Sequence, residues 1–223
     1  VKRVTSRRLS RALAGLLWLW PALGCAQESR ATSPDRFAAL ILAAEQAAAR
    51  GHREVSVRLA RKLTSQYESS GATNAAEHTS AGRAYVLQGV GNVDAVKAAL
   101  AAFDRATAMD SSYLESQRRT AALFLDKYDA PEARALYSGV LRRAPDDAEA
   151  LLGLARVEEF ESKGNPLETA RKSANANPRF ASARAFIARL HLDVEAFDSA
   201  RVTARSAVAL DSALLDAWSV LGA

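Results

Sequence analysis

The sequence predicts an all-α fold in which short helices follow one another in pairs. Two observations support this: 49 of the 223 residues are alanine, against 11 glycines and 6 prolines, and a sequence pattern recurs about every 34 residues. Alanine has the highest intrinsic helix propensity, whereas glycine and proline interrupt helices. With 49% hydrophobic and 25% charged residues, the composition is that of a globular chain, so a disordered one is excluded.

The first 24 residues predict a signal peptide. Five basic residues between Lys2 and Arg11 account for the whole formal charge of +5, and a short apolar run follows them. This order is the layout of a secretory signal. A membrane-spanning helix needs about 20 apolar residues, and Pro21 interrupts this run. A buried or amphipathic first helix is the alternative, but residues 12–23 offer it no polar face.

Cys25, the only cysteine of the chain, directly follows this apolar run and Gly24. The segment resembles the lipobox of bacterial lipoproteins, in which small residues precede a cysteine that is acylated and becomes the N-terminus. Gly24 and Cys25 fit that pattern, whereas positions 22 and 23 depart from it. Simple signal cleavage after Gly24 or Ala26 remains the alternative. We expect an exported protein, in the periplasm or outer membrane as a lipoprotein and otherwise secreted.

The remainder of the chain carries no net charge, since 25 basic and 25 acidic residues follow from Cys25 onward. A nucleic-acid-binding domain usually has a basic excess, so we expect no nucleic-acid partner. A membrane is expected to be contacted only through the N-terminal lipid or signal. Residues 25–36 are mostly polar and predict a tether between this anchor and the fold.

The repeat begins at residue 37. Pro145 and Pro178 lie 33 residues apart, each after a helical stretch, and Pro131 and Pro166 lie 35 apart, each at the start of one. Proline is tolerated in the first turn of a helix. A period of about 34 residues made of helix, turn and helix resembles the tetratricopeptide repeat.

The resemblance covers residues 37–223. Its copies are 37–70, 75–113, 114–147, 148–180 and 181–214, with an incomplete sixth from 215. The third copy matches over a full unit through its small and aromatic residues, which are Ala121, Phe124, Ala133, Tyr137 and the closing Ala144-Pro145-Asp146-Asp147. The resemblance implies a right-handed superhelical solenoid of antiparallel helix pairs. An irregular helical bundle with accidental spacing is the alternative.

In such a solenoid, large side chains fill the space between neighbouring repeats, and no single pair buries its own apolar face. We expect this role for Phe103, Phe124, Tyr137 and Trp218. Residues 213–223 are unusually apolar, so we expect an unfinished repeat in which Trp218 and Leu221 are not both buried. The alternative is that this last helix is itself the cap.

No catalytic, cofactor-binding or metal-binding residues are predicted. The chain has no His-Glu-x-x-His, no glycine-rich phosphate loop and no Gly-x-Ser-x-Gly. Its histidines, His52, His78 and His191, are scattered and are expected to be exposed or packed rather than ligands. We therefore expect a non-enzyme. The alternative is the N-terminal repeat region of a larger secreted enzyme, for example a peptidase, whose catalytic domain lies beyond residue 223.

The resemblance implies a groove, lined by the first helix of each pair, that holds a protein or peptide. Applied to four successive copies, the family pattern places four arginines in this groove: Arg83, Arg118, Arg156 and Arg189. Because guanidinium groups pair well with carboxylates, we expect acidic or carboxylate-ended peptides as partners. The alternative is that Asp126, Glu159 and Asp193, near the same face, simply neutralise the row.

Overall fold

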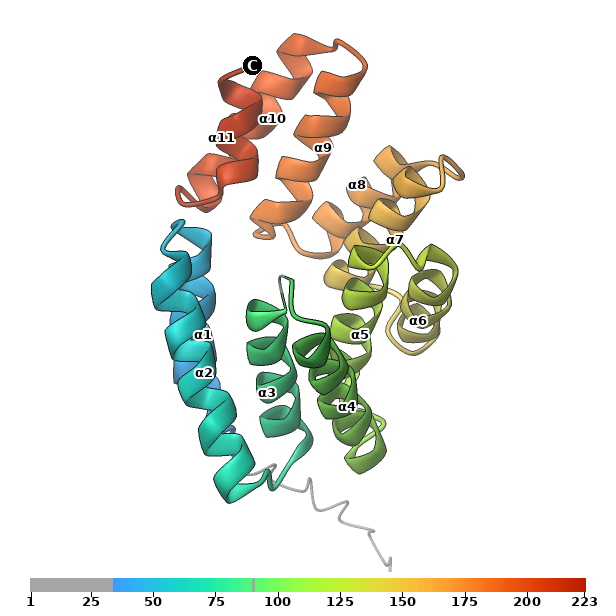
Figure 1. Cartoon of the computed structure of the whole chain (residues 1–223). Coiled ribbons are helices and arrows are strands. Elements are labelled where there is room, and N and C mark those ends of the chain that lie inside the picture. Colours follow the sequence, from blue (N-terminus) through green and yellow to red (C-terminus); the bar gives the residue numbers. More distant parts are fainter. Residues whose placement is uncertain (1–33, 90) are drawn as a thin grey trace, which may run out of the picture. The chain divides into compact units, whose positions relative to one another are not determined.

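The computed structural model describes residues 34–89 and 91–223, and in these residues it contains eleven helices and no strand (Figure 1). The helices are α1 (Ala38–Ala49), α2 (Arg53–Ser70), α3 (Ala75–Gln88), α4 (Val93–Met109), α5 (Leu114–Asp126), α6 (Ala130–Arg143), α7 (Ala148–Phe160), α8 (Pro166–Ala176), α9 (Ala181–Asp193), α10 (Phe197–Leu210) and α11 (Leu215–Leu221). The predicted signal peptide and Cys25 lie outside the described residues.

The helices pack as consecutive antiparallel pairs (Figure 1). Within a pair, α1 packs on α2, α3 on α4, α5 on α6, α7 on α8 and α9 on α10, and the second helix then packs on the first helix of the next pair. The prediction of an all-α solenoid built from such pairs is confirmed. First helices also contact one another, α1 with α3, α3 with α5, α5 with α7 and α9 with α11, whereas α7 and α9 make at most marginal contact.

Helix caps set the start of several second helices. Asn92, Asp129 and Asn165 each accept a hydrogen bond from the backbone N–H three residues further on, which satisfies one of the free donors of a helix start. Pro131 and Pro166 lie in the first turns of α6 and α8, as predicted.

A residue in the left-handed conformation follows the end of every first helix from α1 to α9. These residues are Gly51, Gly91, Tyr128, Ser162 and Glu195, with φ of 76°, 74°, 67°, 53° and 57°. A left-handed residue just past a helix end stops the helix and turns the chain. The second helix can therefore run back against the first.

Two glycines allow aromatic rings to pack between helices. A Cβ on Gly82 of α3 would overlap the Phe103 ring of α4, and one on Gly153 of α7 would overlap the Tyr137 ring of α6. Phe103 and Tyr137 are buried, in line with their predicted packing role. The same prediction for Trp218 is wrong, since its side chain is 49% exposed. The orientation of α11 about its own axis places Ala217 and Val220, and not Trp218, against the neighbouring helices.

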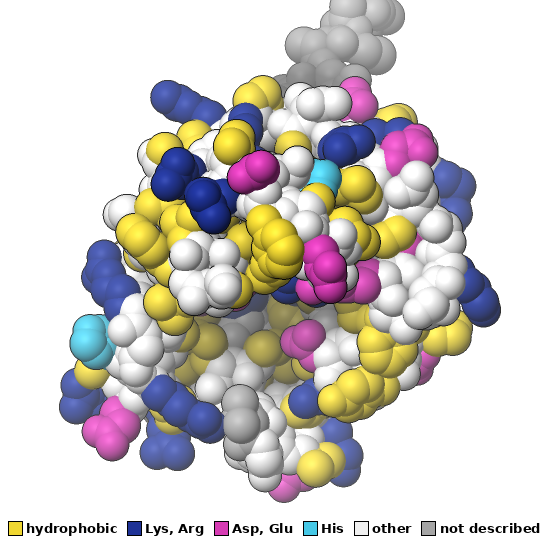
Figure 2. All heavy atoms as spheres, turned by 90° about the horizontal axis from the view of Figure 1, so that it is seen from above, with side chains coloured by type: hydrophobic (Ala, Val, Ile, Leu, Met, Phe, Trp, Pro, Cys, Tyr) yellow, Lys and Arg dark blue, Asp and Glu magenta, His cyan; other side chains and the backbone are white. Residues whose placement is uncertain are grey.

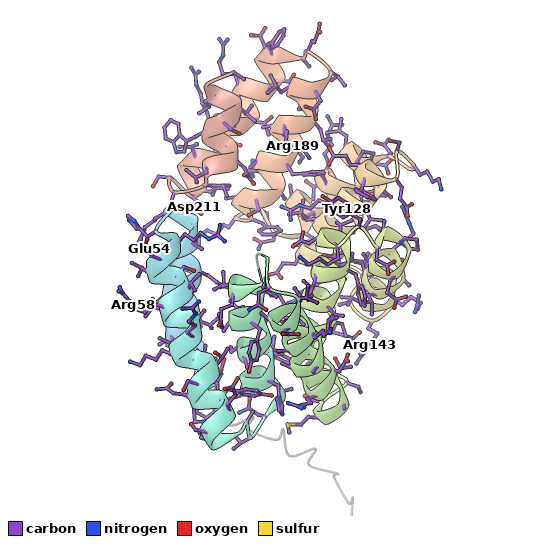
Figure 3. All side chains as sticks on the ribbon, in the orientation of Figure 1. Glu54, Arg58, Tyr128, Arg143, Arg189 and Asp211 are labelled. Carbon is purple, nitrogen blue, oxygen red and sulfur yellow. The ribbon has the colours of Figure 1, made fainter. Side chains whose placement is uncertain are left out.

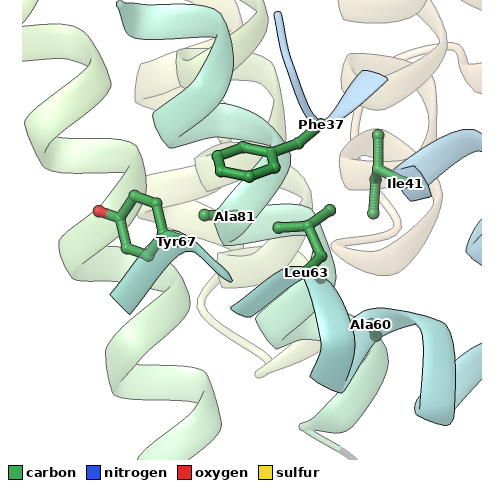
Figure 4. Close-up of a cluster of buried hydrophobic side chains, with 7 residues drawn as sticks. Phe37, Ile41, Ala60, Leu63, Tyr67 and Ala81 are labelled. Atoms are coloured by element: carbon green, nitrogen blue, oxygen red, sulfur yellow. The ribbon is translucent and has the colours of Figure 1, made fainter. Parts of the chain in front are cut away.

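The first pair is tightly joined to α3. Phe37, Ile41, Leu63 and Tyr67 form a buried cluster with Ala81 of α3 (Figure 4). Burying a side chain of this size contributes about 1.5–3 kcal/mol, so the cluster stabilises the junction between the first two repeats.

Candidate functional site

Three hollows follow one another along the face formed by the first helices. Their volumes are about 210 Å³ between α3 and α5, about 320 Å³ between α5 and α7, and about 470 Å³ between α7 and α9. Neighbouring hollows share lining residues: Arg119 and Ala122 belong to the first two, and Arg156 and Ser182 to the last two. They therefore form one groove, and all four predicted arginines line it.

Arg83 of α3 is tied to the helices on both sides of it. Its guanidinium forms a bidentate ion pair with Glu45 of α1 and a further ion pair, 3.2 Å long, with Glu115 of α5. Burial alone would raise the pKa of Glu115, but a hydrogen bond from Tyr113 and the charges of Arg119 and Arg83 outweigh it and lower that pKa. Arg83 thus links three repeats and has little capacity left for a partner.

Arg118 of α5 also forms ion pairs with a neighbouring repeat. It pairs with Asp147 at 2.5 Å and with Glu149 at 3.2 Å, both at the start of α7. Asp147 also caps α7, because its carboxylate accepts the N–H of Ala150. The link therefore joins the third repeat to the beginning of the fourth.

Arg189 of α9 pairs with Glu159 of α7 at 2.7 Å and with Asp193 at 3.3 Å (Figure 3). Two of the three carboxylates expected to neutralise the row are thus in contact with it, whereas Asp126 forms no ion pair with a described residue. The guanidinium also stacks on the Phe186 ring, 4.9 Å from its centroid.

Arg156 of α7 differs from the other three. It is exposed, and no residue in the described part of the chain forms an ion pair with it. Its guanidinium lies 6.0 Å from the centroid of the Phe186 ring, on the border of the two larger hollows. Of the four predicted arginines, this is the one without an ion pair among the described residues, and the nearby charge of Asp126 acts on it without contact.

The reason is visible in the helix register. Arg83, Arg156 and Arg189 are each the ninth residue of their helix. The second residue of a first helix is a carboxylate in α5 (Glu115), α7 (Glu149) and α11 (Asp216), but it is Ser182 in α9. Since Glu115 pairs with Arg83 of the preceding repeat, Ser182 leaves Arg156 without the equivalent partner.

The hollow beside Arg156 is lined by both apolar and charged side chains. Leu125, Phe160, Ala185 and Phe186 are its apolar residues, and Ser182, two arginines and the carboxylates Glu159 and Asp216 complete the lining. The ring of Phe160 meets that of Tyr128, which is 80% exposed, at a centroid distance of 5.9 Å (Figure 3). Seen from above in Figure 2, Lys and Arg side chains lie around much of the outline and also nearer the middle, and acidic side chains lie beside a recess.

No group of three or more His, Cys, Asp and Glu side chains in residues 34–89 and 91–223 could hold a metal ion. His78 is buried and its Nδ1 is 2.8 Å from the hydroxyl of Tyr67. Within the same residues, no helix has the length and apolar character needed to cross a membrane.

Comparison with solved structures identifies the fold. A tetratricopeptide-repeat protein of Thermus thermophilus superposes with a TM-score of 0.54 at 18% identity, covering 66% of this chain and 83% of that one. The fold is a tetratricopeptide-repeat fold. Pseudomonas aeruginosa pilF gives a TM-score of 0.52 at 18% identity, covering 82% and 87% of the two chains.

A chain of the APC/C hetero-tetramer Cut9-Hcn1 has a TM-score of 0.56 at 12% identity and covers 82% of this chain, which spans only 35% of that one. No protein-family model and no curated protein matches the sequence. At these identities the likeness shows the fold alone.

Sequence reasoning placed the four arginines on one face but missed their contacts. Asp147 was named only as part of the segment that closes the third copy, and Glu115 and Glu149 were not singled out. A signal was present: a carboxylate at the second position of the next first helix, which a comparison of the copies position by position would have revealed. The same comparison would have singled out Arg156 through Ser182.

Proposed function

We propose that this protein is a non-catalytic scaffold that binds an acidic segment of another protein at the α7–α9 part of the groove. One observation carries the proposal: Arg156 has no ion-pair partner in the described residues and borders the two larger hollows of the groove. An unpaired guanidinium beside a concave surface is a ready site for a carboxylate.

The hollow offers a ligand both charge and apolar contact. Phe186 and Phe160 provide aromatic surface, and aromatic and arginine side chains dominate the binding energy of many protein interfaces. A segment with a carboxylate next to a large apolar side chain would satisfy both features. The ligand would not have to displace Glu159 from Arg189, because Arg156 forms no ion pair with a described residue, although the charge of Asp126 acts on it.

The decisive variant is Ser182→Glu. It places a carboxylate at the position that Glu115 and Glu149 occupy in other repeats, so we expect it to pair with Arg156 and block acidic ligands. A pool of labelled acidic peptides should bind at least about tenfold more weakly, as expected from the loss of one charged hydrogen-bond pair. Binding is measured by fluorescence anisotropy, with melting and helicity recorded by circular dichroism.

The matched control is Ser199→Glu on α10, which adds the same charge to an exposed serine outside the three hollows. Arg156→Ser should reproduce the loss without adding charge. If Ser182→Glu and Arg156→Ser both bind the peptides as the unaltered chain does, Arg156 is not the recognition point.

We further propose that the scaffold is exported and held at the bacterial envelope by lipid on Cys25. What supports this is the sequence pattern of the N-terminal segment, with the only cysteine at its end. A single acyl chain anchors only marginally, so stable attachment needs two. Cys25→Ala should move the expressed protein from the detergent phase to the aqueous phase in detergent partitioning. Equal partitioning of both proteins into the aqueous phase would contradict lipidation.

A further inference from the structure

A second cationic surface lies on α2, outside the groove. Arg50, Arg53, Arg58, Arg61 and Lys62, here called the α2 basic cluster, fall within one short stretch of which Glu54 is the only acidic residue. All five are exposed. None of them forms an ion pair with a residue of the described chain, unlike Arg83, Arg118 and Arg189 of the groove.

Part of this cluster surrounds a hollow. Arg53, Arg58 and Arg61 line a cavity of about 540 Å³ between α2 and the C-terminal end of α3, and its other lining residues are Glu54, Val57, Leu87 and Gln88. Glu54 and Arg58 are one turn apart on the N-terminal half of α2 (Figure 3). Three guanidinium groups against one carboxylate leave this concave surface with a net positive charge.

The α2 basic cluster belongs to the repeat in which the described chain begins. The segment before α1 is fixed to α3, because Arg36 pairs with buried Glu77 at 2.7 Å and Ser80 donates to Asp35 at 2.5 Å. From residue 25 to residue 34, even a fully extended chain spans only about 30 Å. A lipid on Cys25 would therefore limit how far residue 34 can be from the membrane, and the α2 basic cluster lies at the other end of α1 from residue 34, about 18 Å further on.

We propose that the α2 basic cluster binds anionic phospholipid headgroups at the surface of the membrane to which the chain is tethered. The proposal rests on the envelope tether proposed above. Each basic side chain near an anionic membrane strengthens binding roughly fivefold, and guanidinium groups form paired hydrogen bonds with phosphates. No residue of α2 lines the three hollows of the groove, so lipid and peptide can be bound at the same time.

The test compares the full chain on vesicles of phosphatidylglycerol with phosphatidylcholine and on vesicles of phosphatidylcholine alone. The triple variant Arg53→Ser, Arg58→Ser, Arg61→Ser should bind the anionic vesicles roughly 100-fold more weakly and depend less on salt. The matched control is Arg171→Ser, Arg201→Ser, Arg205→Ser, which removes the same charge from exposed arginines that form no ion pair in the described chain. The control should bind nearly as the unaltered chain does.

Equal losses in the two triple variants would overturn the proposal, because net charge alone would then explain the binding. Full competition by soluble glycerol phosphate would also overturn it and assign the hollow to a small anion. Carrying Cys25→Ser in every protein separates this test from that of the tether. If detergent partitioning of the chain with Cys25 intact shows no lipid but the Cys25→Ser proteins still prefer anionic vesicles, the tether proposal fails and the lipid-binding surface remains.

Discussion

The α3–α5 part and the α7–α9 part of the groove each have an arginine at the ninth residue of their first helix, Arg83 in α3 and Arg156 in α7. At α3–α5, Arg83 is held between Glu45 and Glu115, and the hollow beside it measures about 210 Å³. At α7–α9, Arg156 has no such partner among the described residues, and the hollow measures about 470 Å³. One site is closed by its own carboxylates and the other is open.

Arginines at the same helix position in two repeats therefore have different roles in this protein. Arg83 at the ninth position of α3 joins repeats through Glu115, the second residue of α5, whereas Arg156 at the ninth position of α7 faces Ser182, the second residue of α9. The helix packing around the two sites rests on similar glycine–aromatic contacts. Changes to this shared packing should therefore have larger effects than changes to the charges that differ.

The largest expected effect comes from the shared packing. Gly82→Ala and Gly153→Ala should each lower the free energy of unfolding by about 1–3 kcal/mol, because the added methyl group overlaps the buried ring of Phe103 or Tyr137. Thermal and urea unfolding measure the effect. Gly139→Ala is the control: its Cβ would meet only Arg142, so better helix propensity should stabilise that variant by up to about 1 kcal/mol.

The second prediction concerns removal of the carboxylates that pair with Arg83 at the α3–α5 part of the groove. Glu115→Ser removes the partner that Arg83, Arg119 and Tyr113 share, so we expect a loss of about 1–2 kcal/mol in unfolding free energy. The same change removes the ion pair between Arg83 and Glu115, while the ion pair between Arg83 and Glu45 remains. Removing both carboxylates, with Glu45→Ser added, should give α3–α5 a measurable affinity for acidic peptides. No gain in anisotropy for the double variant would show that an unpaired arginine alone does not make a site.

The third prediction concerns pH. The folded-state pKa of Glu115 is lower than its ordinary value, so its stabilising contribution is complete above the unfolded-state pKa and is lost as the pH falls through the folded-state pKa. The unaltered chain should therefore lose stability more steeply than Glu115→Gln as the pH falls below about 4.3, the ordinary pKa of glutamic acid. Parallel curves of melting temperature against pH would contradict this assignment.

The smallest expected effect on stability comes from closing the open site. Ser182→Glu should raise the unfolding free energy by only about 0.2–1 kcal/mol, because Arg156 is exposed and a surface ion pair contributes little. The gain should vanish in the background of Arg156→Ser, which a double-mutant cycle measures. A gain that persists there would mean that the glutamate acts on the start of α9 and not on Arg156.

The fold was predictable because it depends on local signals that repeat. Alanine content, Pro131 and Pro166 at helix starts and the period of about 34 residues all act within one helix pair. The two expectations for Trp218 disagreed with each other. Its exposure contradicts the expected packing role and agrees with the expectation that Trp218 and Leu221 are not both buried; α11 exposes it because Ala217 and Val220 fill the contact with α9 and α10.

The helix pairs, their order and the row of arginines on one face follow from the amino-acid sequence, because side-chain periodicity along a helix decides which residues share a face. Which of those arginines form ion pairs depends on how the helices pack in three dimensions. Arg83 meets Glu115, and Arg189 meets Glu159, across distances of about 30 residues in the chain. An ion pair between repeats depends on the packing of two helices, and that geometry leaves Arg156 beside a serine and facing the groove.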